Sequence, residues 1–187
     1  MNLNVKERGD HVATFRWIEV RLMEMLSAWV PTTPEMEVKL LFGAHIWDVA
    51  QHADALGKRT QELRLPLQDS LAPSSAYVDL LTDLAGTEET SKRIAGFYDA
   101  ILPGLDRRFR DYLLRVDTLL DGPTVRILDR IMGDTTRLVN ESMALRSELP
   151  ALRLAEEKWL SDLREREAGL RNVVIYRQPS ATPAGVA

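Results

Sequence analysis

The chain of 187 residues is long enough for one domain, or slightly more, and for a core that needs no disulfide or metal support. Its 28 acidic and 24 basic residues give a formal charge of −4, which lacks the basic excess of general nucleic-acid binders. The sequence has no cysteine, which excludes disulfides, thiolate metal sites, iron–sulfur clusters and cysteine nucleophiles.

The apolar stretches of the sequence are short and interrupted by charges. The N-terminus is polar and lacks the apolar core of a signal peptide, and no stretch is long enough to span a bilayer. We therefore expect a cytoplasmic protein that contacts neither a membrane nor nucleic acid.

Two long helices are predicted at the start of the chain, joined by a proline-rich turn. Over residues 6–30, apolar residues recur every three or four positions, which is typical of one buried helical stripe. Pro31 and Pro34 interrupt the pattern, and Thr33 is expected to cap a second helix that continues to about residue 64. The apolar side of this second helix is expected to comprise Leu40, Leu41, Ala44, Trp47, Ala55 and Leu56.

The later elements are separated by prolines and glycines. Thr87 is expected to cap a helical segment, and Pro103 should kink or split that segment because proline removes a backbone donor. In chain order we expect a crossing loop over residues 65–75, a short helix over 76–85, the Pro103 segment over 87–120, a helix over 123–149 and a charged helix over 151–170.

These elements predict an all-α fold. Residues 1–170 are expected to form a single helical-bundle domain, and residues 171–187 a C-terminal tail, whose Val173–Tyr176 stretch could dock in a groove. Two long helices, one long crossover and two further helices define a ferritin-like four-helix bundle, here with an additional C-terminal helix. Another all-helical bundle is the alternative, since periodicity alone does not separate the two.

A carboxylate interrupts the apolar stripe of the first helix. Glu19 shares a face with Phe15, Leu22 and Leu26. If that face is buried, Glu19 must be paired, hydrogen-bonded, protonated or bound to a metal, because an unpaired buried charge is costly. If Glu19 instead lies at the edge of the stripe, it reaches water and needs no partner.

Two of the three histidines lie within eight residues of the second helix. His45, Asp48 and His52 are three and four positions apart, so they point to one side of the helix. Asp48 could share a metal ion with either histidine, whereas the histidines are about 10 Å apart along the axis and are not expected to bind one ion directly. Imidazole with carboxylate suits iron, manganese or zinc. The alternative is a solvated or edge-packed polar patch.

The last long helix carries Asp134 and Glu141 on its apolar stripe. In a di-metal carboxylate bundle, one helical turn separates a glutamate from the histidine that ligates the same ion. Here Arg137 stands where that histidine would be needed, and a guanidinium cannot ligate a cation. Arg137 is instead expected to pair with a carboxylate, namely Asp134, Glu19 or Asp48.

Two stretches of the chain resemble a ferritin-like family of bacterial proteins. They are FGAHIWDVAQHADALGKRTQELR at residues 42–64 and DGPTVRILDRIMGD at residues 121–134, and the similarity extends over residues 10–148. The resemblance implies a helical bundle with an interior metal site, often used for oxidation chemistry.

The resemblance also implies a set of site residues. Such proteins often carry a histidine where this chain has Arg137, and their metal is iron or manganese. The residues that map onto metal positions are Glu19, Asp48 and His52 in the first half of the chain and Asp134 in the second half.

The first functional hypothesis is a metal-dependent oxidoreductase, a non-haem iron oxidase or oxygenase that acts on a small molecule. The four residues named above would hold the metal, and dioxygen would bind at an open position. His45 would lie behind the ligands, and Arg137 would hold an anionic group of the substrate by paired hydrogen bonds.

The second hypothesis is a metal-free bundle that serves as a binding, assembly or accessory subunit. Its polar interior would be a salt-bridge network centred on Arg137, of a kind that can specify packing without adding much net stability. Outer faces with Trp17, Trp29 and Trp159 would contact a partner protein or a second copy, so a homo-oligomer such as a dimer is expected.

Two charged stretches are interpreted as solvated surface. The basic cluster at Arg107–Arg110 is flanked by Asp106 and Asp111, which favours an exposed helix face over a nucleic-acid site. The helix over 151–170 is expected to be exposed and salt-bridged, with a narrow apolar side that covers the bundle or a partner.

Overall fold

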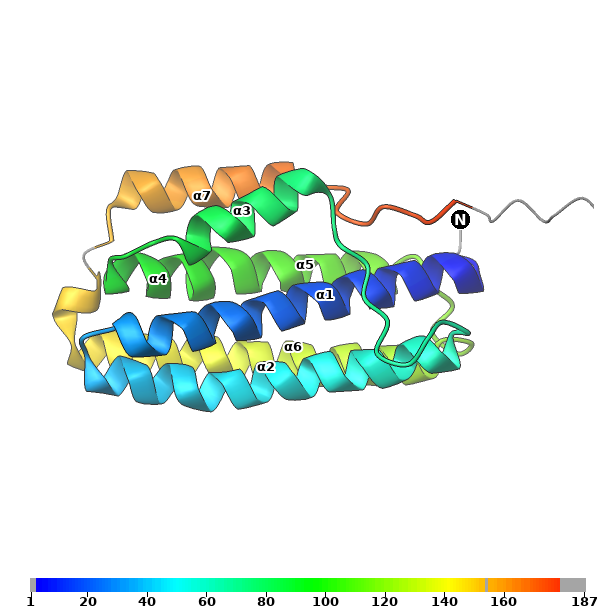
Figure 1. Ribbon diagram of the computed structural model, residues 1–187, viewed down its shortest axis with the longest axis horizontal. Helices are drawn as coiled ribbons and strands as arrows, with labels where there is room; N and C mark the ends of the chain where they lie inside the picture. Colours follow the sequence, from blue (N-terminus) through cyan, green and yellow to red (C-terminus); the bar gives the residue numbers. More distant parts are fainter. Residues whose placement is uncertain (1–2, 154, 179–187) are drawn as a thin grey trace, which may run out of the picture.

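The structure is a computed structural model in which residues 3–153 and 155–178 are described, and this part of the chain is helical without any β-strand (Figure 1). The prediction of an all-α fold is therefore confirmed. The α-helices are α1 (Val5–Trp29), α2 (Met36–Glu62), α3 (Ser75–Ala85), α4 (Thr90–Gly96), α5 (Leu102–Leu113), α6 (Gly122–Glu148) and α7 (Glu157–Gly169). None of the helices in these residues combines the length and apolar character needed to cross a membrane.

The bundle consists of four long helical segments, namely α1, α2, the continuous segment from α4 to α5, and α6 (Figure 1). Helices α1 and α2 form an antiparallel hairpin. The chain then returns along the bundle through α3, so α5 runs in the same direction as α2, and α6 runs antiparallel to both. Helices α3 and α7 lie side by side over one side of these rods.

The helix starts follow local chemistry, although two predicted caps are wrong. In α1, Asn4 and Glu7 form a capping box, with each side chain accepting from the other residue's backbone N–H. The predicted cap Thr33 instead donates its hydroxyl to the carbonyl of Trp29 at 2.8 Å, and the cap position of α2 is Glu35. The predicted cap Thr87 is likewise replaced by Glu89.

Pro103 splits its segment, as predicted, by a change of helix type. A π-helical turn, Phe97–Ile101, lies directly before α5, and Pro103 occupies the first turn of α5. Proline has no N–H, so the carbonyl of Asp99, four positions earlier, loses its usual helical donor. Arg164 of α7 replaces that donor at 2.9 Å, which ties α7 to the proline break.

Helix α7 begins later and lies deeper than predicted. It starts at Glu157, not at residue 151, because Pro150–Arg153 form a 3₁₀ turn. Its Glu167 is fully buried and forms salt bridges with Arg107 and Arg108 of α5. The interpretations of α7 and of the basic cluster as simply solvated are therefore wrong at these residues. A buried carboxylate needs such partners because its desolvation is costly.

The buried face of α2 differs from the predicted one. Val38, Phe42 and Val49 lie in the core, together with His45 and His52. Of the predicted apolar side, Leu56 lies in the core and Leu41 packs against it. Most of the remainder of that side faces outward, since Leu40 is 68% exposed, Trp47 is 67% exposed and Ala44 is also exposed. Helix α2 has apolar residues on two faces, and two buried histidines make its core face look polar in the sequence.

Trp29 is also buried, so its predicted place on an outer face is wrong. It packs against Phe42 and Phe97, and its indole N–H donates to the carbonyl of Ala85 at 3.0 Å. Trp17 and Trp159 are half-buried against the core. Trp29 thus connects α1 and α2 to the end of α3, as an aromatic side chain with a satisfied polar atom does in many cores.

A pair of substitutions on α2 tests which face is buried. We expect Phe42→Ala to lower the free energy of unfolding by about 3–5 kcal/mol, because it removes a fully buried ring. The matched change Leu40→Ala, two positions away, should cost at least about 2 kcal/mol less than Phe42→Ala, because this leucine is 68% exposed and lies outside the core. Urea unfolding of both variants measures the difference, and similar losses in both would contradict the assigned face.

Candidate functional site

The candidate site begins with a buried carboxylate on α1. Glu19 is 2% exposed, and its Oε2 lies 3.5 Å from Nδ1 of His52 on α2. Both side chains are withdrawn from water. Of the alternatives for Glu19 that the sequence left open, the structure shows a paired, buried carboxylate.

His52 bridges Glu19 to a second acid. Its other ring nitrogen, Nε2, lies 3.2 Å from Oδ2 of Asp134 on α6. Burial acts to lower the pKa of His52, but the charges and hydrogen bonds of Glu19 and then Asp134 outweigh burial and raise it. His52 is thus favoured as an imidazolium that donates from both nitrogens, one to each acid.

Arg137 of α6 holds three carboxylates on the water-facing side of this pair. Its guanidinium lies 3.0 Å from Asp48, 3.1 Å from Glu141 and 3.4 Å from Asp134. Hydrogen bonds to Asp48 and Glu141 raise the pKa of Arg137, so its charge is fixed. Burial raises the pKa of Asp134, but its bonds to His52 and Arg137 outweigh burial and lower it.

The site continues inward through a second histidine. The His45 ring lies 2.8 Å from Glu141 through Nε2 and 2.7 Å from the hydroxyl of Tyr98 through Nδ1. Burial lowers the pKa of His45, although Glu141 opposes the shift, and burial raises that of Tyr98 well above its usual value. A neutral His45 satisfies both contacts: Tyr98 O–H donates to Nδ1, and Nε2–H donates to Glu141.

These contacts form one connected cluster, which we call the Arg137 network. Four carboxylates face the His52 ring and the Arg137 guanidinium, and Arg130 adds a further positive charge 3.7 Å from Asp134. The cluster runs from the dry interior at Glu19 to Arg137, which is 43% exposed. Its members are Glu19, His52, Asp134, Arg137, Asp48, Glu141, His45 and Tyr98.

The structure joins every residue that the sequence singled out, but through different partners. Arg137 pairs with Asp134 and Asp48 as expected, and it does not contact Glu19. Tyr98, which completes the hydrogen bonding of His45, was not assigned to the site. The sequence signal that could have found it is its position five residues before Pro103, because the structure forms a π-helical turn there and such turns often lie at functional sites.

The placement of these residues does not fit a shared metal ion. Glu19 and Asp134 contact opposite nitrogens of the His52 ring, so an ion at either nitrogen would meet only one of them. Asp48 and Asp134 both face the Arg137 guanidinium, whose charge would repel a cation. Within residues 3–153 and 155–178, no three histidine or acidic side chains are grouped so that they could hold a metal.

Comparison with protein families, with curated proteins and with solved structures found no match for this chain. The expected place in a ferritin-like family therefore stays a prediction from the sequence.

The two histidines should respond to pH in opposite ways. The raised pKa of His52 stabilises the fold below the unfolded histidine pKa of about 6.5, and this contribution is lost as pH rises through the folded-state pKa. The lowered pKa of His45 has the reverse effect, because its contribution is lost as pH falls.

We expect His52→Gln to cost more unfolding free energy at about pH 5.5 than at about pH 9, whereas His45→Gln should cost more at the higher pH. Chemical denaturation of the wild type and both variants at the two pH values measures these differences. Equal costs at both pH values for His52→Gln would show that His52 is not a charged bridge.

Proposed function

We propose that the protein is a metal-free helical bundle with ferritin-like topology that serves as a binding or assembly subunit. The single observation that carries the proposal is the position of Arg137, whose guanidinium lies against Asp48 and Asp134, two of the three carboxylates that the metal site would require. An arginine fills a cluster of acids with a permanent charge and offers no lone pair or open position for dioxygen.

The direction of the helices supports the ferritin-like part of the proposal. An antiparallel pair, one long crossover and a second antiparallel pair is the order that defines such bundles with one crossover. Here α1 and α2 form the first pair, the segment through α3 makes the crossover, and α4 with α5 and α6 form the second pair (Figure 1).

The competing hypothesis is the iron or manganese oxidoreductase. It requires Glu19, Asp48, His52 and Asp134 to release their present partners and turn to one ion. His52 would also have to give up its proton, because only a neutral imidazole ligates a metal. The raised pKa of His52 opposes that step.

Metal analysis decides between the two. We expect the wild type, incubated with Fe(II) or Mn(II) and desalted, to retain no stoichiometric metal. Arg137→His places a ligand one helical turn from Asp134 and removes the guanidinium, so this variant should gain metal. Arg126→His makes the same change at an exposed position of α6 and should gain none. One equivalent of metal in the wild type that is lost in Asp48→Ala and His52→Ala would support the oxidoreductase.

The exposed side of α2 supports the assembly part of the proposal. Met36, Leu40, Ala44 and Trp47 form an apolar stripe along this side, and nothing lies within 4 Å of the space that a side chain on Gly43 would fill. Small residues at positions 43 and 44 suit a close crossing of two helices. In an antiparallel crossing there, Leu40 of one copy meets Trp47 of the other, so the stripe is complementary to itself, as a two-fold contact requires.

We therefore expect the wild type to be a dimer in solution, measured by light scattering after gel filtration. Trp47→Glu should produce a folded monomer, because it places a charge in the contact and removes no core packing. Leu119→Glu alters another exposed leucine, off the stripe, and should leave the dimer intact. A monomeric wild type, or equal disruption by both changes, would contradict a contact through α2.

A further inference from the structure

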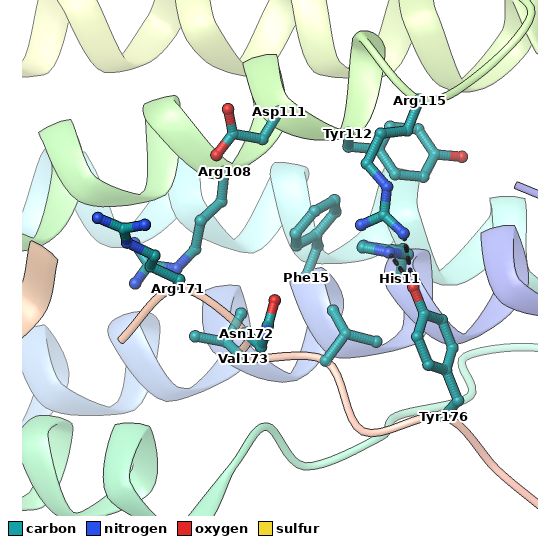
Figure 2. A pocket seen from close by; sticks show the side chains of 11 residues that line it. His11, Phe15, Arg108, Asp111, Tyr112, Arg115, Arg171, Asn172, Val173 and Tyr176 are labelled. Atoms are coloured by element: carbon teal, nitrogen blue, oxygen red, sulfur yellow. Dashed lines mark hydrogen bonds between the residues drawn. The ribbon is translucent and has the colours of Figure 1, made fainter. Parts of the chain in front are cut away.

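A cavity of about 310 Å³ lies between α1, α5 and the stretch 171–176 that follows α7 (Figure 2). Its apolar wall includes Phe15, Tyr112 and Val173, which are all buried. None of its lining residues belongs to the Arg137 network. Cavities of this size lie at the lower end of the range for small-molecule sites.

The wall formed by the chain after α7 is held at defined points. The backbone N–H of Ser74 donates to the carbonyl of Val173 at 2.8 Å, and Arg108 donates to the carbonyl of Leu170 at 2.8 Å. Arg108 also forms a salt bridge with the buried Glu167. The Arg108 guanidinium is therefore already paired within the protein. Val173 is buried, so its predicted docking in a groove is confirmed.

At one end of the cavity, hydrogen bonds connect an arginine, a tyrosine and a histidine. Arg115 donates to the hydroxyl of Tyr176 at 3.1 Å, and this hydroxyl lies 3.1 Å from Nε2 of His11 (Figure 2). Burial, and then the charge of Arg115, lowers the pKa of His11 to about 4, so its ring is neutral at neutral pH. The hydroxyl of Tyr176 therefore donates to Nε2, and the His11 proton stays on Nδ1.

The cavity has more donors and positive charge than the described residues satisfy. Nδ1 of His11 is buried and has no hydrogen-bond partner among them. Within residues 3–153 and 155–178, neither Arg115 nor Arg171 has a carboxylate within 4 Å. Among the described residues that line the cavity, Asp111 is the only acidic one. Figure 2 shows Arg115 and Arg171 with Phe15 between them in the view.

We propose that this cavity binds a small organic acid. Its carboxylate would lie at Arg115, at the end where Arg115 and His11 both contact the Tyr176 hydroxyl, and its apolar body would lie against Phe15, Tyr112 and Val173. Arginine recognises carboxylates by paired, charge-assisted hydrogen bonds, and buried aromatic and aliphatic walls favour a hydrophobic body over a bare inorganic ion. The proposal deepens the proposed function as a binding subunit and rests on it.

Calorimetric titration of the full chain with phenylacetate tests the proposal. We expect saturable binding, at least tenfold weaker binding of the neutral analogue 2-phenylethanol, and no comparable binding of inorganic phosphate. Arg115→Gln should weaken phenylacetate binding by tenfold or more, since a lost charged contact to a carboxylate has an effect of this order. Because Arg115 is exposed, this change leaves the fold intact.

Three further variants keep the test decisive. Arg171→Gln alters the far end of the cavity and should weaken binding less than Arg115→Gln does. Val174→Trp should abolish binding by filling the cavity while both arginines remain. Arg126→Gln removes an exposed arginine on α6, outside the cavity, and should bind like the wild type. Absent binding in the wild type, unchanged affinity in Arg115→Gln and Val174→Trp, or phosphate binding as tightly as phenylacetate would overturn the proposal.

The result is separable from the test of the proposed function. Binding is measured in metal-free buffer, and the metal content of the same sample is determined independently. Bound metal together with phenylacetate binding would overturn only the metal-free function, whereas a metal-free protein without binding would overturn only the organic-acid site.

Discussion

The pairing of Glu19 with His52 is the interaction on which the arrangement of the bundle depends. A carboxylate withdrawn from water needs a positive partner, and His52 supplies it only if its ring keeps a second proton. That charge in turn requires Asp134, which lies on a third helix. One buried acid on α1 therefore constrains α2 and α6 together. Arg137 partly neutralises the carboxylates of Asp48, Asp134 and Glu141. Because this part of the cluster is close to water, the negative charge that is left unpaired there costs little free energy.

The same rule applies at two other junctions of the fold. Asp121, fully buried before α6, accepts from Arg59 of α2 at 2.8 Å and from Tyr112 of α5 at 2.5 Å. Glu167 of α7 is buried against two arginines of α5. Each buried acid joins elements that are distant in sequence. Such pairs add little net stability relative to apolar packing, but a misaligned helix would leave a charge unpaired. Their main effect is to select one alignment.

Local signals in the sequence predicted the helices and their breaks, because helical periodicity and proline act over a few residues. The pairing of Arg137 with an acid was also predictable, since a guanidinium among carboxylates has no better partner. Its partner Asp134 was predictable as well, since it lies three positions away on the same helix. The choice of Asp48 over Glu19 was not, because it depends on how α1 and α2 pack against α6. The buried face of α2 was mispredicted because His45 and His52 were weighed as polar. The cavity was beyond reach, since His11 and Tyr176 are 165 positions apart.

On the proposed function, two groups of arginines have different roles. The first group forms salt bridges with carboxylates of other elements and so joins helices; it comprises Arg59, Arg108 and Arg137. Arg115 and Arg171 line a cavity with only Asp111 as an acid, so their charge is free to meet a ligand. Arg137 occupies the water-facing side of the acidic cluster, where its charge would repel a metal ion. The place for recognition is then the side of the bundle, where the chain after α7 closes over α1 and α5.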